Sequence, residues 1–157
     1  MKIILGINSY HADSSACIVK NGKVLAAIEE ERINRIKHWA GLPLQSIKEC
    51  LAQTNLDLRN INHIAINTNP LSNLKEKSIF FLKNYIKGSK KIEILNRLKK
   101  KINIKNDLNK GLYPIKLAKK VKIHYIDHHI SHIASAFYPS NFEKAIGLSI
   151  DGFGDFS

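Results

Sequence analysis

The sequence is poor in the residues that several classes of protein require. Its 157 residues include two cysteines, four prolines and one tryptophan. Two cysteines cannot build a disulfide scaffold or a four-cysteine zinc site, which favours a reduced, cytoplasmic setting. The first apolar run covers only residues 3–7, and no later stretch approaches the ~20 apolar residues of a membrane-spanning helix. We therefore expect neither a signal peptide nor a membrane partner.

The formal net charge of +12 belongs to one internal segment. Residues 75–122 hold 16 of the 25 Lys and Arg residues and only three of the 13 acidic residues, so the remainder is nearly neutral. A stacking platform for single-stranded nucleic acid needs interleaved aromatic residues, and this segment has few, among them Phe80, Phe81 and Tyr85. A surface helical hairpin with its lysines in solvent is the favoured interpretation, and nucleic-acid binding is the minor one.

Hydrophobic residues make up 44% of the chain, which is enough for a folded core. Their spacing predicts alternating strands and helices, with Asn21-Gly22 as a two-residue hairpin turn and Pro43 at the start of the first long helix. The expected strands are residues 2–7, 16–20, 23–29, 63–67, 122–126 and 145–150; the expected helices follow Pro43 and cover residues 74–87, 91–102 and 128–138.

This order of elements is typical of an α/β fold, namely a ribonuclease-H-like half-domain with a mixed sheet and flanking helices. The chain stops three residues after a glycine-rich turn, where the last strand would lack its continuation. We therefore expect residues 1–157 to be the N-terminal part of a larger domain, with a basic helical insert at about residues 73–120.

Three histidines at the start of the last helix form the densest group of candidate ligands. His128 and His132 are one helical turn apart, so both imidazoles can reach a single cation. His129 and His132 are also close on a helix, which leaves the liganding pair open. A divalent metal would need a further ligand, usually a carboxylate. The alternative is a histidine-rich helix start that caps or packs locally.

Two further motifs follow predicted strands. Asp151, Gly152 and Gly154 come after residues 145–150, where glycines would let the backbone approach a phosphate closely. An ordinary turn explains this motif equally well. His11 and Asp13 follow the first strand and are well placed for a site, although an Asx-type turn also accounts for them.

A charged run, Glu29-Glu30-Glu31-Arg32, precedes Arg35, Lys37 and His38. Such a run is usually a solvated surface. Arg and Lys beside a metal would instead suit an anionic substrate.

The order of these motifs resembles the NodU/CmcH-type O-carbamoyltransferases, which serve nodulation-factor and antibiotic biosynthesis. The resemblance covers residues 1–70 and 121–157, and only the basic insert lies outside it. It is carried by HADSSA at 11–16, NG at 21–22, EEER at 29–32, RIKHWAG at 35–41, HHISHIASAF at 128–137 and IDGFGD at 150–155.

The resemblance implies an actin/hexokinase-type ATPase fold, similar to the domain that transfers threonylcarbamoyl groups to tRNA, followed by a YrdC-like domain. It also implies two-step chemistry: carbamoyl phosphate and ATP give carbamoyl-adenylate, and the carbamoyl group then passes to an acceptor hydroxyl. A non-catalytic truncated remnant, or a nucleotide- or polyanion-binding module, remains the alternative, as does a protein that acts like the tRNA-modifying domain.

The resemblance also assigns roles to residues. It implies that His128 and His132 bind a divalent metal, iron or zinc, with a remaining aspartate expected beyond Ser157. Lys37 would hold the anionic carbamoyl donor. Asp151, Gly152 and Gly154 would form a phosphate-facing turn for ATP. His11 would act as acid or base, with Asp13 in the catalytic set; many members have His directly before Asp, whereas Ala12 intervenes here.

Overall fold

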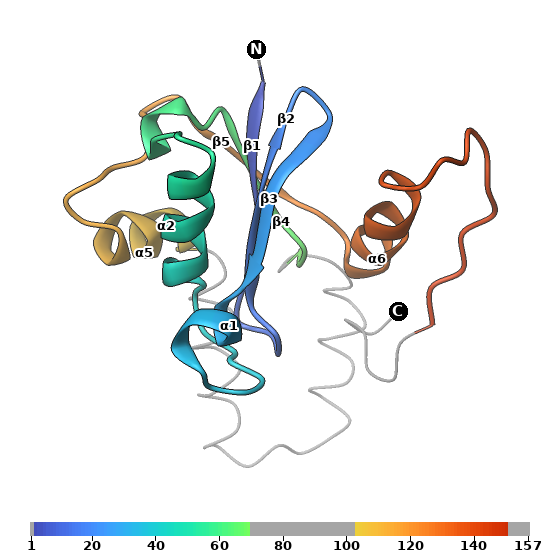
Figure 1. Ribbon diagram of the computed structural model, residues 1–157, viewed down its shortest axis with the longest axis horizontal. Helices are drawn as coiled ribbons and strands as arrows, with labels where there is room; N and C mark the ends of the chain where they lie inside the picture. Colours follow the sequence, from blue (N-terminus) through green and yellow to red (C-terminus); the bar gives the residue numbers. More distant parts are fainter. Residues whose placement is uncertain (1, 70–102, 151–157) are drawn as a thin grey trace, which may run out of the picture.

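The computed structural model describes residues 2–69 and 103–150 (Figure 1). The predicted helices at residues 74–87 and 91–102 lie outside the described residues, and so do Asp151, Gly152 and Gly154. Within the described parts no helix is long and apolar enough to cross a membrane. The last part of the basic insert is described, and it contains a helix, α5 (Ile104–Gly111).

Five strands form one mixed sheet in the order β3-β2-β1-β4-β5. The strands β1, β2 and β3 are antiparallel neighbours, whereas β1, β4 and β5 run parallel to one another. This arrangement confirms five of the six predicted strands and the mixed character of the sheet. Their bounds are Ile3–Asn8 for β1, Ser15–Lys20 for β2, Lys23–Glu29 for β3, His63–Ile66 for β4 and Lys122–Tyr125 for β5.

The hairpin turn between β2 and β3 lies at Asn21-Gly22, as predicted. Both residues have positive φ, 50° and 83°, which is the conformation that a two-residue hairpin requires. The Asn21 side chain accepts a hydrogen bond from the Lys2 backbone at 3.1 Å, so the turn is also tied to the start of β1.

One face of the sheet carries the hydrophobic core. Alternate residues of β1 are buried, as the two-residue period of a strand requires. They pack with buried residues of α2 (Leu44–Gln53) and α5, which lie together on one side of the sheet (Figure 1). The helix α6 (His128–Phe137) lies on the other side (Figure 1). The fully buried large side chains include Ile3, Leu5, Ile18, Ile47, Leu58, Ile61, Ile64, Ile104, Leu108 and Leu112.

Within the charged run at residues 29–32, Arg32 is exposed as a solvated run requires, whereas Glu30 is buried. Glu30 opens the short helix α1 (Glu30–Asn34) and is only 2% exposed. Its carboxylate accepts hydrogen bonds from the backbone nitrogens of Gln45 at 3.1 Å and Ser46 at 2.7 Å. The N-cap residue of α2 is Pro43, whose ring has no atom that can accept these bonds. Glu30, which is remote in the sequence, therefore caps the helix.

The predicted strand at residues 145–150 is wrong. The chain forms neither helix nor strand there, and it pairs with no strand of the described residues. Ile146, Leu148 and Ile150 are each more than 80% exposed. Apolar alternation reports the propensity to form a strand, whereas a strand exists only where a neighbour accepts and donates the ladder hydrogen bonds.

Cys50 of α2 makes stability depend on pH. The thiol is fully buried and donates to the Ala16 carbonyl at 3.4 Å. Burial, with smaller contributions from Cys17 and Glu49, raises its pKa from 9.0 to about 11. The unfolded chain therefore loses this proton first as the pH rises. The contribution of Cys50 is complete below pH 9.0 and is lost as the pH approaches about 11.

We expect the free energy of unfolding to fall across this alkaline range, and to fall less in Cys50→Ala. Urea unfolding followed by circular dichroism between pH 7 and about 10.5 measures both slopes. Because Cys17 and Tyr10 also have raised pKa values, some slope persists in the variant. An identical slope in the two proteins would contradict the assignment to Cys50.

Candidate functional site

Two loops are joined at the carboxyl end of β1. The first, residues 9–14, follows β1, and the second, residues 35–41, follows α1. Tyr10 donates its backbone N–H to the Gly41 carbonyl at 3.2 Å, and Ser14 donates to the Trp39 carbonyl at 3.0 Å. The buried Ser14 hydroxyl adds a bond to the Gly41 carbonyl at 2.8 Å. The two loops are therefore held as one unit.

Four non-glycine residues in these loops have a left-handed backbone. Tyr10, Asp13, Arg35 and His38 have φ values between 54° and 62°. This conformation is uncommon for residues with a side chain, and it persists only where the surrounding structure enforces it. Such residues gather at binding and catalytic sites, so their concentration here marks the two loops as a candidate site.

His38 is held by two carboxylates. Its ring Nδ1 lies 2.9 Å from Asp13 Oδ1, and its backbone N–H donates to Glu31 Oε2 at 3.1 Å. The ligand atoms of the three side chains lie within 4.8 Å of one another. The sequence placed Asp13 in the catalytic set, but nothing in the sequence indicated that it faces His38.

The start of α6 fixes the predicted histidine cluster. Asp127 at the N-cap accepts from the backbone nitrogens of His129 at 3.1 Å and Ile130 at 3.4 Å, which is the usual role of an aspartate there. His128 is buried, and its Nε2 lies 3.2 Å from His132 Nε2. The Nδ1 atom of His129 instead lies 2.8 Å from Ser149 Oγ. Of the two pairs open at the sequence level, His128 and His132 face each other.

This spacing fits a shared metal ion. Two nitrogens that each lie ~2.0–2.1 Å from one ion, at angles between octahedral and tetrahedral, are ~2.8–3.4 Å apart. The observed 3.2 Å between the Nε2 atoms of His128 and His132 falls within this range. Imidazole nitrogens suit iron and zinc among other transition metals.

His11 joins this cluster from the loop after β1. Its ring centroid lies 5.6 Å from that of His128, so the structure brings together two predicted site residues from opposite ends of the chain. Lys37 makes no hydrogen bond or ion pair within the described parts of the chain. Its side chain is exposed, and it lies in the second loop only because it precedes His38 in the sequence.

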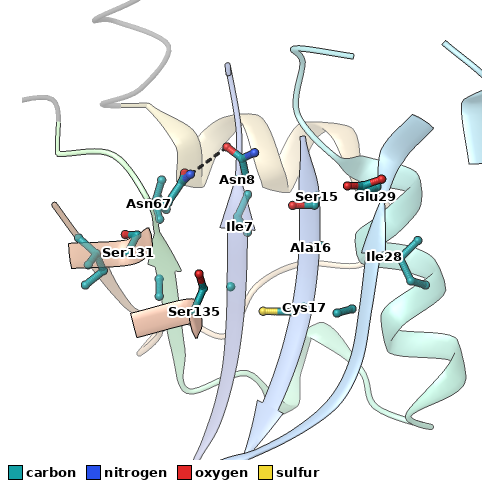
Figure 2. A pocket seen from close by; sticks show the side chains of 15 residues that line it. Ile7, Asn8, Ser15, Ala16, Cys17, Ile28, Glu29, Asn67, Ser131 and Ser135 are labelled. Atoms are coloured by element: carbon teal, nitrogen blue, oxygen red, sulfur yellow. Dashed lines mark hydrogen bonds between the residues drawn. The ribbon is translucent and has the colours of Figure 1, made fainter. Parts of the chain in front are cut away.

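A cavity of about 440 Å³ lies between the sheet and α6 (Figure 2). Small and apolar residues make up most of its lining, and a few polar side chains join them. Figure 2 shows Asn8 and Asn67 side by side at the ends of β1 and β4, where Asn67 Nδ2 donates to Asn8 Oδ1 at 3.0 Å. The other polar lining residues are Ser15, Glu29, Ser131 and Ser135.

Sequence reasoning missed this cavity. A polar residue directly after an apolar strand is the signal that could have indicated it, because the carboxyl ends of parallel strands share one edge of a sheet. Asn67 follows β4 directly, and Asn8 is the last residue of the parallel neighbour β1. Ser131 and Ser135 are one turn apart on α6, which places both on the helix face that lines the cavity.

Comparison with known proteins places the chain in a family. The family described as carbamoyltransferase N-terminus matches residues 3–157. An uncharacterized protein of Synechocystis sp. is 35% identical over 100% of this chain and 26% of its own length. The nodulation protein NolNO of Sinorhizobium fredii is 34% identical over 96% of this chain and 21% of its own length. The chain thus spans about a quarter of the length of these relatives.

Among solved structures, YeaZ from Pseudomonas aeruginosa matches with a TM-score of 0.34 and 15% identity, over 45% of this chain and 31% of its own. The match to the family over nearly the whole chain confirms the resemblance found in the sequence motifs. The chain belongs to the carbamoyltransferase N-terminal family.

Proposed function

We propose that the chain is the N-terminal segment of an ATP-dependent carbamoyltransferase, which moves a carbamoyl group from carbamoyl phosphate, through carbamoyl-adenylate, to the hydroxyl of a sugar, natural product or other small molecule. The observation that carries the proposal is the cluster of His11, His128 and His132, assembled from the loop after β1 and the start of α6. Membership of the carbamoyltransferase N-terminal family supports the proposal that the transferred group is a carbamoyl group.

In this proposal His128 and His132 hold a divalent metal, iron or zinc, through their Nε2 atoms. The ion would supply electrostatic stabilisation to the carbonyl oxygen as the acceptor hydroxyl attacks. The distance of 3.2 Å between the two nitrogens supports a shared ion. Asp127 supports the pair indirectly, because its cap fixes the first turn of α6, from which both histidines project.

His11 lies against His128 and is proposed to take part in proton transfer near the transferred group. Lys37 is proposed to provide a cation for the anionic carbamoyl donor, on the sequence resemblance alone. Asp151, Gly152 and Gly154 are proposed to face a phosphate of ATP, on the sequence pattern alone.

We also propose that the sheet is the ribonuclease-H-like half of an actin/hexokinase-type ATPase fold. Three antiparallel strands followed by two parallel ones, in the order β3-β2-β1-β4-β5, support this assignment. In such a fold the ligands lie at the carboxyl ends of the parallel strands. Asn8 and Asn67, which line the cavity, stand at that edge.

The proposal is tested with the full-length gene product that contains this chain. Purified protein is incubated with carbamoyl phosphate, ATP, a divalent metal and a panel of hydroxyl-bearing acceptors. We expect pyrophosphate release that requires both carbamoyl phosphate and ATP, and a carbamoylated product that mass spectrometry detects as a gain of one carbamoyl group. Absence of pyrophosphate release at every metal tested would leave the chain as a non-catalytic binding module instead.

A further inference from the structure

The two joined loops bring together a pair of side chains, Asp13 and His38, arranged as in an acid–base dyad. A carboxylate oxygen accepts hydrogen bonds, so the 2.9 Å contact between Asp13 Oδ1 and His38 Nδ1 requires the proton on Nδ1. The lone pair of the neutral ring then lies on Nε2. A carboxylate that fixes the tautomer in this way leaves the opposite nitrogen ready to accept a proton.

We propose that His38 accepts the proton of the acceptor hydroxyl and that Asp13 is the positioning residue that holds its ring; the assignment rests on the proposed carbamoyltransferase function. The hydroxyl oxygen forms a bond to the carbamoyl carbon, and its proton passes to His38 Nε2. The bond from that carbon to the adenylate phosphate oxygen breaks, and its electron pair leaves with AMP.

Three features support this role for His38. Its side chain is 77% exposed, so a substrate can reach the ring. Its backbone is held by Glu31 and has φ of 54°, a conformation that the loop must enforce. The hydrogen bonds between the loops at residues 9–14 and 35–41 fix His38 to the segment that carries His11, and His11 lies against His128.

His11 lacks the support that His38 has. The Nδ1 atom of His11 lies 3.4 Å from the Ala12 carbonyl, which is a longer contact to a weaker, neutral acceptor. A carboxylate stabilises the imidazolium that forms when the ring takes a proton, and a carbonyl does so less. The geometry therefore favours His38 over His11 as the acceptor of the hydroxyl proton.

The first experiment reads the tautomer and needs no catalytic activity. Two-dimensional ¹⁵N–¹H spectra of the histidine rings, recorded at a pH where His38 is neutral, are expected to show its proton on Nδ1. In Asp13→Asn the side-chain amide can donate to Nδ1 instead, so the proton should move to Nε2. Asparagine tolerates the left-handed backbone at position 13, where φ is 59°. An unchanged tautomer, or a proton on Nε2 in the parent chain, would overturn the positioning role.

The second experiment measures turnover in the full-length gene product. His38→Asn keeps a residue that accepts positive φ, and we expect kcat for acceptor carbamoylation to fall ~10²–10⁴-fold with little change in KM for carbamoyl phosphate. Asp13→Asn should act through His38, so the double variant should be no slower than His38→Asn alone. His124→Asn, a change to an exposed ring on β5, is the matched control and should retain activity.

The two experiments separate failures of different kinds. If the parent enzyme carbamoylates an acceptor and His38→Asn does so at the same rate, His38 is not the proton acceptor, although the proposed function stands. If the parent enzyme transfers no carbamoyl group, the proposed function fails together with this role. Because Asp13, Glu31 and His38 could also bind a cation, Mn²⁺ is titrated during the tautomer measurement. Selective broadening of the His38 signals at stoichiometric Mn²⁺ would also overturn the proposal.

Discussion

Replacing Glu30 by alanine is expected to lower the free energy of unfolding by about 3 kcal/mol, which is a large share of the stability of a small domain. The Glu30 carboxylate is buried and accepts from the backbone nitrogens of Gln45 and Ser46, in the first turn of α2. Alanine would leave both donors without a partner, and hydrogen bonds to a charged acceptor contribute ~1.5–3 kcal/mol each. The loss would also remove a negative charge from the positive end of the helix.

Urea unfolding followed by circular dichroism measures this loss. Glu30→Gln is the informative intermediate, because its amide keeps one acceptor oxygen but places an NH₂ donor opposite the second backbone N–H. Its free energy of unfolding should therefore lie between those of the parent chain and Glu30→Ala. The control is Glu49→Ala on the same helix, where the side chain is exposed and the change should stay within about 0.5 kcal/mol. Equal stability of Glu30→Ala and Glu49→Ala would show that Glu30 does not cap α2.

Local patterns predicted the parts of the fold in which the cause is itself local. Asn and Gly are the residue types that most readily adopt the positive φ angles of the turn at Asn21-Gly22. The spacing of Leu44, Ile47 and Leu51 matches the period of the helix α2. Residues 145–150 have the same kind of local signal, yet no described strand pairs with them. Strand pairing depends on a partner, and the alternation of residues in one segment does not specify it.

The candidate site was predictable only in part, for the same reason. Helical spacing placed His128 and His132 on one face, but the orientation of His129 toward Ser149 is set by a segment beyond the helix. The pairing of Asp13 with His38 joins two loops through space, and neither loop carries a local sign of the other. Glu30 resembled a solvated residue because its partners belong to the next helix.

Removing either imidazole of the proposed metal pair is expected to abolish both metal binding and carbamoyl transfer. Each of His128→Ala and His132→Ala removes one of two nitrogens that lie 3.2 Å apart. Once one imidazole has bound the ion, the second binds it with almost no further loss of translational freedom. A single remaining imidazole lacks this advantage and therefore holds an ion far less tightly. Electrostatic stabilisation by a bound metal is worth several kcal/mol, so activity should fall at least ~10²-fold.

The metal content, measured by inductively coupled plasma mass spectrometry on the full-length gene product, gives a readout that does not depend on activity. We expect about one metal ion per chain in the parent protein and nearly none in either variant. His129→Ala is the matched control on the same helix, since His129 Nδ1 contacts Ser149 Oγ and its ring meets His128 edge-on, at a centroid distance of 5.7 Å. A variant that lost activity but kept its metal would remove His128 and His132 from the coordination sphere and assign them to substrate binding. Full activity in both variants would contradict the proposed centre, because transfer would then need neither of the two facing Nε2 atoms.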